Sequence, residues 1–363
     1  MNKKKIIFVL PDLSFGGAQK TFSNIINIIS KSKNNYKFYL ILINNNNIVF
    51  NINNSISVIN LNCTRTIFSI FKFINILTKI KPTYVISTTT HLNILCIISK
   101  LFLSKKKTKF IIRESNPTFY RTDINIILKL ISKFTYKFSD MIICLSEFVK
   151  DEVLKNVNIN PNKVITIYNP IDFESILNLA EQPTQNIFSK DEYNVVFVGR
   201  LSKQKNVKLL IEVIDKINIK NIKLRIIGDG DDKDSINKKI IKSQLQNKIE
   251  LLNFTENPYP YIKNSDLFIL PSKWEGFGHV IAESLFLGTP VICLNTKGIV
   301  NIFFKCKYFT LLKYNSIEKI SDYIELFLLK FKNNKPLIDT ECLQELNSKD
   351  ISLKYFDAIT NLK

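Results

Sequence analysis

Residues 267–287, LFILPSKWEGFGHVIAESLFL, place three kinds of sequence in direct succession. A short and continuous apolar run comes first, then a loop with two glycines, then an apolar segment long enough for two helical turns. Continuous apolar strands are typical of parallel sheets that are buried on both faces, and helices connect such strands. The stretch therefore predicts one strand–loop–helix unit of a doubly wound α/β fold.

The same alternation runs through the whole chain. In the first half we expect strands at 5–10, 38–43, 84–87, 110–112, 141–145 and 164–168, and helices at 19–31, 65–79, 93–103, 124–138 and 147–155. The pattern restarts with strands at 193–198, 224–227, 249–252, 267–270 and 291–294 and helices at 207–217, 232–245, 259–262 and 279–287. Helices at 317–330 and about 339–359 close the chain.

A length of 363 residues also favours two domains. We expect a Rossmann-like domain at 1–180, a linker at 181–192 and a second Rossmann-like domain at 193–345. The helix in 346–363 should pack back toward the first domain. Ligands bind outside the carboxyl ends of the strands in open α/β sheets, so the functional residues should lie there.

Composition excludes several classes of protein. The sequence has no run of 18 uncharged apolar residues and starts with only a short apolar run, so neither a transmembrane helix nor a signal peptide is expected. Six scattered cysteines show no metal-ligand spacing, which predicts reduced thiols, no zinc site and a cytoplasmic location.

The net charge of +20 is unevenly distributed. Residues 1–180 hold 24 Lys/Arg and 9 Asp/Glu, a net charge of +15, whereas residues 181–363 hold 27 and 22, a net charge of +5. The asymmetry indicates an anionic partner for the first half, either nucleic acid or an acidic membrane surface. Codon usage that favours Lys, with a merely solvated basic surface, is the alternative.

Glycine and arginine are scarce, with 9 and 5 residues, so their positions are informative. Gly16 and Gly17 follow the first strand and precede a helix, where backbone N–H groups can approach an oxygen-rich ligand. A plain tight turn is the alternative. Gly228 and Gly230 end a later strand, and a sharp turn with Asp229 or Asp231 as helix cap is the preferred interpretation there.

Two further motifs indicate binding of a phosphorylated sugar. Arg200 and Lys205 follow Gly199 closely enough to converge on one anion, although either could be a solvated surface cation. Glu275 and Glu283 stand eight residues apart in the opening stretch, where carboxylates can accept hydrogen bonds from sugar and ribose hydroxyls. Paired carboxylates would equally suit a glycoside hydrolase.

Together these motifs resemble the family-four retaining glycosyltransferases of GT-B fold, over nearly the whole chain and most densely over 193–295. The resemblance implies that Glu275 contacts donor-sugar hydroxyls, that Glu283 binds the ribose, and that Arg200 and Lys205 neutralise the diphosphate. It assigns donor binding to Gly16 and Gly17 in the first domain and to the loop and helix start formed by Gly276, Phe277, Gly278 and His279 in the second.

The resemblance extends to other segments of the first domain. It places His91 near the donor sugar, with a partly buried residue at a helix start as the alternative. Residues 113–117, Arg-Glu-Ser-Asn-Pro, would help to line the acceptor site. Asn301 and Asn253 depart from the family pattern, which has Glu and Gly there more often, so the donor is less well specified than the reaction.

The implied reaction transfers a hexosyl group from a UDP-linked or other nucleotide sugar to a glycan or polyprenyl-diphosphate-linked acceptor. It retains the α configuration and needs no metal or cofactor. Basic helices at 65–79 and 124–138 could dock on the anionic inner face of the cytoplasmic membrane. A hydrolase would explain the carboxylates but not the Arg/Lys pair, and a nucleic-acid binder would explain the charge but not the Gly/Glu motifs.

Overall fold

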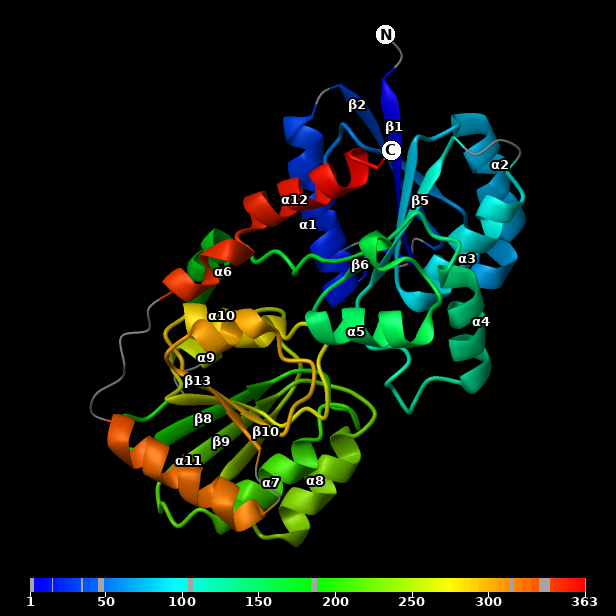
Figure 1. Ribbon diagram of the computed structural model, residues 1–363. Coiled ribbons are helices and arrows are strands. Elements are labelled where there is room, and N and C mark those ends of the chain that lie inside the picture. The colour runs from blue at the N-terminus through cyan, green and yellow to red at the C-terminus, as the bar shows by residue number, and fades with distance from the viewer. Residues whose placement is uncertain are drawn as a thin grey trace. The chain divides into compact units, whose positions relative to one another are not determined.

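The computed structural model describes residues 3–14, 16–33, 35–44, 49–103, 107–183, 188–313, 316–332 and 340–362. The chain forms two compact units (Figure 1). The first unit comprises Met1–Pro170 and Leu346–Lys363, and the second comprises Ile171–Glu345. Each contains a wholly parallel sheet covered by helices, which confirms the predicted pair of doubly wound domains.

The first unit is built on seven strands in the order β3-β2-β1-β4-β5-β6-β7. They are β1 (Lys4–Leu10), β2 (Tyr36–Leu42), β3 (Ser57–Asn60), β4 (Tyr84–Thr88), β5 (Lys109–Glu114), β6 (Met141–Cys144) and β7 (Val164–Thr166). The central strands are fully buried because their apolar residues contact helices on both faces of the sheet: Ile7 belongs to one core and Phe8 to the other.

Six helices and a 3₁₀ turn form these two layers of the first unit. The turn η1 (Thr66–Ser69) with helices α2 (Ile70–Ile80), α3 (Thr90–Leu101), α4 (Ile126–Tyr136) and α5 (Glu147–Asn156) covers one face. The other face is covered by α1 (Gly17–Ser32) and α12 (Ser348–Thr360), which pack against each other. The hydroxyl of Tyr84 donates to the carbonyl of Thr360 at 3.1 Å, so the end of the chain is part of the first unit.

The second unit has six strands in the order β10-β9-β8-β11-β12-β13. They are β8 (Tyr193–Val198), β9 (Ile222–Ile227), β10 (Ile249–Leu252), β11 (Leu267–Leu270), β12 (Val291–Leu294) and β13 (Phe309–Leu312). Its helices are α6 (Phe173–Ala180), α7 (Val207–Lys216), α8 (Lys233–Lys242), α9 (Tyr259–Lys263), α10 (His279–Phe286) and α11 (Ile317–Phe331), with 3₁₀ turns η3 (Asn301–Lys305) and η4 (Glu341–Leu346).

The predicted domain boundary at residue 180 is wrong by one helix. The helix α6 belongs to the second unit, where the ring of Phe173 lies 4.3 Å from that of Phe286 and Asn257 donates to the carbonyl of Leu179 at 2.8 Å. Burial of Ile176 on the inner side of α6 explains the attachment. Residues 184–187 of the predicted linker lie outside the described residues.

Other element predictions also need correction. The short edge strands β3 and β13 were missed, because their apolar runs are brief and only partly buried. The helix expected at about 339–359 is instead η4 followed by α12, and residue 339 itself lies outside the described residues. The break comes at Asn347, whose side chain accepts from the amide of Lys349 at 2.9 Å and so caps α12.

The prediction that all six cysteines are reduced is contradicted. Cys306 and Cys342 form a disulfide with their Cα atoms 5.5 Å apart, while Cys63, Cys96, Cys144 and Cys293 are free and buried. The bonded pair is separated by 36 residues and has no spacing motif, so only the return of η4 toward η3 brings the two sulfurs together.

We expect reduction of this disulfide to lower the stability of the second unit. Opening a 36-residue loop should reduce the free energy of unfolding by about 4 kcal/mol, because the unfolded chain regains conformational freedom. The measurement is denaturant unfolding with and without dithiothreitol. In Cys342→Ser the reductant should have no further effect; an equal response in both proteins would contradict the prediction.

No helix in the described ranges is both long enough and apolar enough to cross a membrane.

Candidate functional site

The loops at the carboxyl edge of the second sheet interlock through backbone hydrogen bonds. The amide of Gly199, after β8, donates to Ile227 at 3.0 Å, and the amide of Leu201 donates to Asp229 at 2.8 Å. The amide of Glu275, after β11, donates to Lys297 at 2.8 Å. Loops that follow four strands thus hold one another in place, so the side chains that they carry are pre-positioned.

An ion pair joins two of the predicted site residues. The ammonium of Lys205 lies 2.8 Å from Oε1 of Glu275, and the two side chains are only 17% and 8% exposed. Seventy residues separate them in the sequence. Different ligands were predicted for them, phosphate for the lysine and sugar for the carboxylate. A buried ion pair is costly to desolvate, so retaining one at a sheet edge is better explained by function than by stability.

Arg200 lies near this pair in sequence but differs from it in environment. Its side chain is exposed, and it is not among the ion-paired residues in the part of the chain that is described. This exposure leaves Arg200 accessible to an anionic ligand and agrees equally with a solvated surface cation, the alternative given above.

The glycine-containing loop ends in a left-handed residue that starts α10. Gly278 has φ 89° and is the N-cap of the helix, where a Cβ would stand 2.8 Å from Cδ1 of Ile281. Because glycine has no side chain to cap the helix, the first amides of α10 can face an anion. The ring of Phe277 lies 5.8 Å from that of Phe303 and 5.1 Å from that of His279, and these contacts anchor the loop.

Glu283 lies one turn into α10 and is 8% exposed. The hydroxyl of Tyr259, on α9, donates to its Oε1 at 3.2 Å. Burial, and secondarily the nearby Glu283 carboxylate, raises the pKa of Tyr259, so the tyrosine stays protonated and keeps donating. This orienting tyrosine was missed by the sequence analysis, since nothing in the spacing of residues 259 and 283 links them.

In the first unit, Gly16 is the N-cap of α1 and Gly17 is its first residue. A Cβ on Gly17 would meet no atom within 4 Å. Asp12 shapes the preceding turn: its Oδ1 accepts from the amide of Ser14 at 3.0 Å and from Nε2 of Gln19 at 3.1 Å. Gly17 thus leaves open space at a helix N-terminus, whereas a Cβ on Gly16 would lie 2.3 Å from Oε1 of Gln19.

His91 is an exposed residue in the first turn of α3. The preceding N-cap residue, Thr89, has φ 74°, a conformation that is strained for a β-branched residue. Thr90 lies 3.1 Å from Thr118, hydroxyl to hydroxyl, so the start of α3 is linked to the loop after β5.

The expectation that Arg113 and Glu114 line an acceptor site is wrong, because each is only 1% exposed. Arg113 donates to the hydroxyl of Tyr355 at 3.0 Å, to that of Thr88 at 2.9 Å, and to the side-chain oxygen of Asn169. Arg113 therefore has a structural role: it links β4, α12 and the segment around Asn169. Of this segment, Ser115 and Asn116 are partly exposed.

Glu114 accepts from the hydroxyls of Tyr136 at 2.6 Å and Thr118 at 3.0 Å. Burial raises the pKa of Glu114 from 4.5 to about 7, against the opposing effect of these hydrogen bonds. The folded protein therefore keeps this proton at pH values where the unfolded chain has lost it.

We expect the stability of the protein to fall as the pH rises from about 4.5 to about 7, by roughly 3 kcal/mol from Glu114 alone. The sign follows because the unfolded state binds fewer protons in that window. Glu114→Gln, which cannot ionise, should lack this component. The test compares chemical unfolding of the two proteins at several pH values; parallel profiles would refute it.

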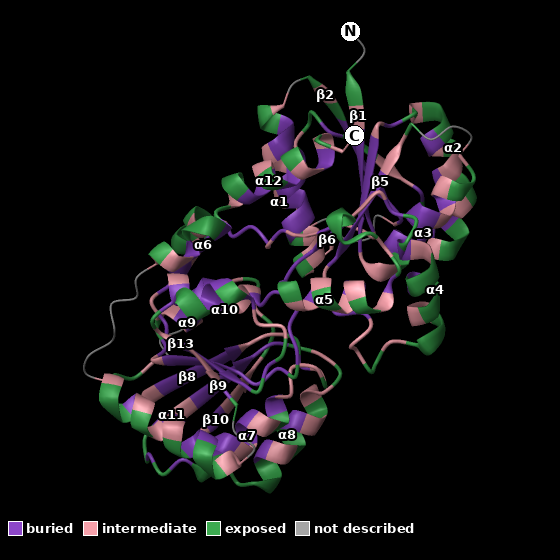
Figure 2. Cartoon of the chain, viewed as in Figure 1, coloured by how far each residue is buried: buried purple, intermediate pink, exposed green. Residues whose placement is uncertain are grey.

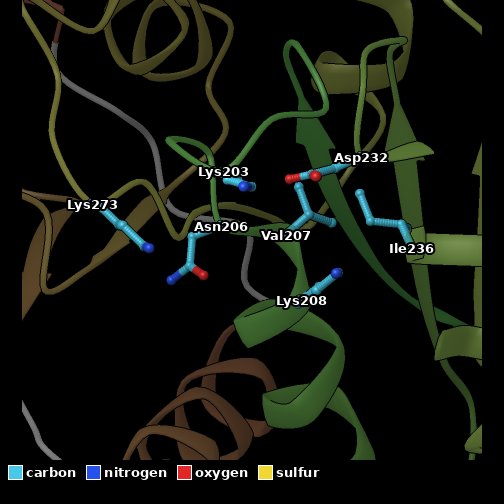
Figure 3. Close-up of a pocket in the computed structure, with 7 residues that line it drawn as sticks. All are labelled: Lys203, Asn206, Val207, Lys208, Asp232, Ile236 and Lys273. Carbon is cyan, nitrogen blue, oxygen red and sulfur yellow. The ribbon is translucent and has the colours of Figure 1, made fainter. Parts of the chain in front are cut away.

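A pocket of about 160 Å³ lies at the start of α7, lined by Lys203, Asn206, Val207, Lys208, Asp232, Ile236 and Lys273 (Figure 3). Its lining residues are sequence neighbours of the site residues rather than the site residues themselves. Asp232, and neither of the two aspartates proposed as caps, is the N-cap of α8, and its side chain makes no capping hydrogen bond.

The two residues that depart from the family pattern lie in the loop after β10 and at the start of η3. Asn253 accepts from Lys233 at 2.9 Å, and Asn301 is the exposed first residue of η3. Among the described residues, no three His, Cys, Asp or Glu side chains gather in a group that could hold a metal ion.

Two family models match consecutive parts of the chain. Residues 45–175 match the model described as Glycosyltransferase Family 4, and residues 180–339 match the one described as Glycosyl transferases group 1. Together they cover β3 to β7 of the first sheet and all six strands of the second, with the loops that carry Arg200, Glu275 and Gly278; β1, β2 and the Gly16–Gly17 turn precede residue 45.

Individual relatives agree with these matches. The chain is 28% identical over 320 residues to an uncharacterized glycosyltransferase of Methanocaldococcus jannaschii, covering 81% of this chain and 78% of that one. It is 31% identical over 210 residues to the N-acetylgalactosamine-N,N'-diacetylbacillosaminyl-diphospho-undecaprenol 4-alpha-N-acetylgalactosaminyltransferase of Campylobacter jejuni, covering 57% and 56%. Among solved structures, Anabaena HepE in complex with UDP and glucose has a TM-score of 0.70 at 16% identity, covering 98% and 96%.

Proposed function

The chain belongs to the family-four glycosyltransferases, and from this premise we propose that it moves a hexosyl group from a nucleoside diphosphate sugar to a hydroxyl of a glycan or lipid-linked acceptor. The observation that carries the donor assignment is the buried Lys205–Glu275 ion pair in the loops beside the N-terminus of α10. It puts a cation, a carboxylate and accessible backbone amides in one place.

Each group has a distinct proposed task. Arg200, Lys205 and the first amides of α10 bind the diphosphate, for which positive charge and N–H donors are suited. Glu275 accepts from donor-sugar hydroxyls, and Glu283, oriented by Tyr259, accepts from the ribose. UDP is the proposed nucleotide, with support from the UDP complex of Anabaena HepE.

The proposed mechanism keeps the configuration of the sugar. The bond from the anomeric carbon to the diphosphate breaks, the acceptor hydroxyl attacks from the same face, and its proton passes to the leaving phosphate oxygen. Arg200 and Lys205 stabilise the charge that develops on the diphosphate. Because two cations are available for this task, we propose that a metal ion is not required.

The names of two relatives support the proposed class of acceptor. The Campylobacter jejuni enzyme acts on a sugar carried by diphospho-undecaprenol, and a further relative, 26% identical over 243 residues, is a capsular polysaccharide biosynthesis glycosyltransferase of Staphylococcus aureus. A polyprenyl-diphosphate-linked or growing glycan is therefore the proposed acceptor, and the cytoplasm is the proposed location.

A screen of nucleotide sugars tests this function. We expect UDP-linked sugars to raise the melting temperature, and UDP to be released when a suitable acceptor is added. The matched control is Lys205→Met, which should lose the stabilisation. Release of free sugar from an oligosaccharide without any nucleotide would instead identify a hydrolase, and binding of RNA or DNA without a response to nucleotide sugars would overturn the proposal.

A further inference from the structure

Large apolar side chains are concentrated on one part of the first unit's surface. Of 18 large hydrophobic residues that are exposed in the described part of the chain, 11 lie between residues 67 and 138. Phe71, on α2, is 81% exposed, and Ile127, on α4, is 61% exposed. Single exposed apolar residues are normal, but such a concentration marks a binding surface.

The elements that carry these residues lie side by side. The helix α3 contacts α4 on one side and η1 and α2 on the other, and all three helices bury their inner sides in the same core. Their outer sides are largely exposed (Figure 2). We call this surface, formed by the outer sides of η1, α2, α4 and the end of α3, the apolar–basic face.

The same elements carry positive charge and no negative charge. Residues 13–113 contain 14 Lys/Arg and no Asp or Glu, and α4 adds Lys129 and Lys133 with no acidic residue. Lys137 lies over the rings of Phe134 and Phe138, at 5.7 and 5.0 Å from their centroids. The ammonium of Lys137 thus makes cation–π contacts with both rings. Lysines combined with exposed aromatic and aliphatic side chains are typical of helices at membrane interfaces.

We propose that the apolar–basic face docks on an anionic lipid bilayer. A bilayer offers both partners that the face needs: acyl chains for Phe71 and Ile127, and negative headgroups for the lysines. Nucleic acid would satisfy only the charge. A second copy of the chain is disfavoured, because a two-fold contact would set helices that carry lysines and no acidic residue against themselves. Only the purpose of the docking, which is access to a lipid-linked acceptor, rests on the proposed function.

Vesicle co-sedimentation tests the docking surface. We expect the full chain to bind vesicles of phosphatidylcholine with phosphatidylglycerol, to bind phosphatidylcholine alone much more weakly, and to dissociate as salt is raised. Phe71→Ser and Ile127→Ser should each weaken binding by about tenfold. Lys133→Gln should weaken it by about fivefold. The matched control is Leu326→Ser on α11, a leucine that is 68% exposed in the other unit, and it should change nothing.

Equal binding to both vesicle types, or equal effects of Phe71→Ser and Leu326→Ser, would overturn the proposal. So would a dimer in sedimentation velocity that Phe71→Ser dissociates, since a second copy would then cover the face. Transfer to a water-soluble acceptor should be unchanged in Phe71→Ser, which shows that the variant is folded. Vesicle binding without any transfer would overturn the proposed reaction and leave the docking surface standing.

Discussion

Arg200→Ala and Glu283→Ala should each reduce sugar transfer by about 100- to 1000-fold. Arg200 is exposed, so its loss should leave the free energy of unfolding almost unchanged and act only on the leaving diphosphate. Glu283 is buried and accepts from Tyr259, so its loss should also cost about 1 to 2 kcal/mol of stability by removing that hydrogen bond.

The measurement is initial-rate kinetics with the donor identified by the screen, together with denaturant unfolding of each variant. Arg121→Ala is the matched control, because Arg121 is also near the surface but pairs with Asp123 in the first unit. Activity in Arg200→Ala equal to that in Arg121→Ala would remove Arg200 from the site.

Gly228→Ala should be the most damaging glycine substitution. Gly228 has φ 153°, and a Cβ there would lie 2.0 Å from the carbonyl oxygen of Gly199. Two loops of the site would have to separate, which should cost at least about 3 kcal/mol and also displace the residues that follow Gly199. We expect a lower melting temperature together with loss of transfer.

Gly17→Ala provides the informative contrast. No protein atom lies within 4 Å of a Cβ at this position, so the variant should fold with unchanged or slightly higher stability. Loss of transfer in a stable Gly17→Ala protein would show that the ligand, and not the protein, needs the space. Full activity would exclude close approach of the donor at Gly17.

The fold could be predicted from the sequence because its central strands are continuous apolar runs. That signal is strong at β1, where five of seven residues are buried, and at β11, where all four are. It finds the edge strands β7 and β10 but misses the edge strands β3 and β13. No helix was predicted at 173–180, so α6 was missed; an amphipathic pattern there would show a buried side but not the unit on which the helix packs.

Candidate site residues can be found from the sequence where a motif is local, but contacts between separate elements cannot. Gly278 and Glu283 share one loop and helix, so their spacing alone places them. The Lys205–Glu275 pair and the Tyr259–Glu283 bond join separate elements, and no sequence spacing encodes either contact. Arg113 was misassigned for a related reason: the resemblance of residues 113–117 to a family segment suggested an acceptor site, but here Arg113 binds three groups of its own unit.

The position of α12 has a consequence for biosynthesis of the protein. Residues 171–345 form a contiguous unit, whereas the first unit lacks one of its two covering helices on the α1 face until residues 348–360 have been made. Phe22 and Ile25 of α1 belong to the core that α12 completes, and Arg113 has no Tyr355 to bind before then. The half of the chain that leaves the ribosome first is therefore the last to be completed, and a nascent chain that stops before residue 348 leaves part of the α1 core without its cover.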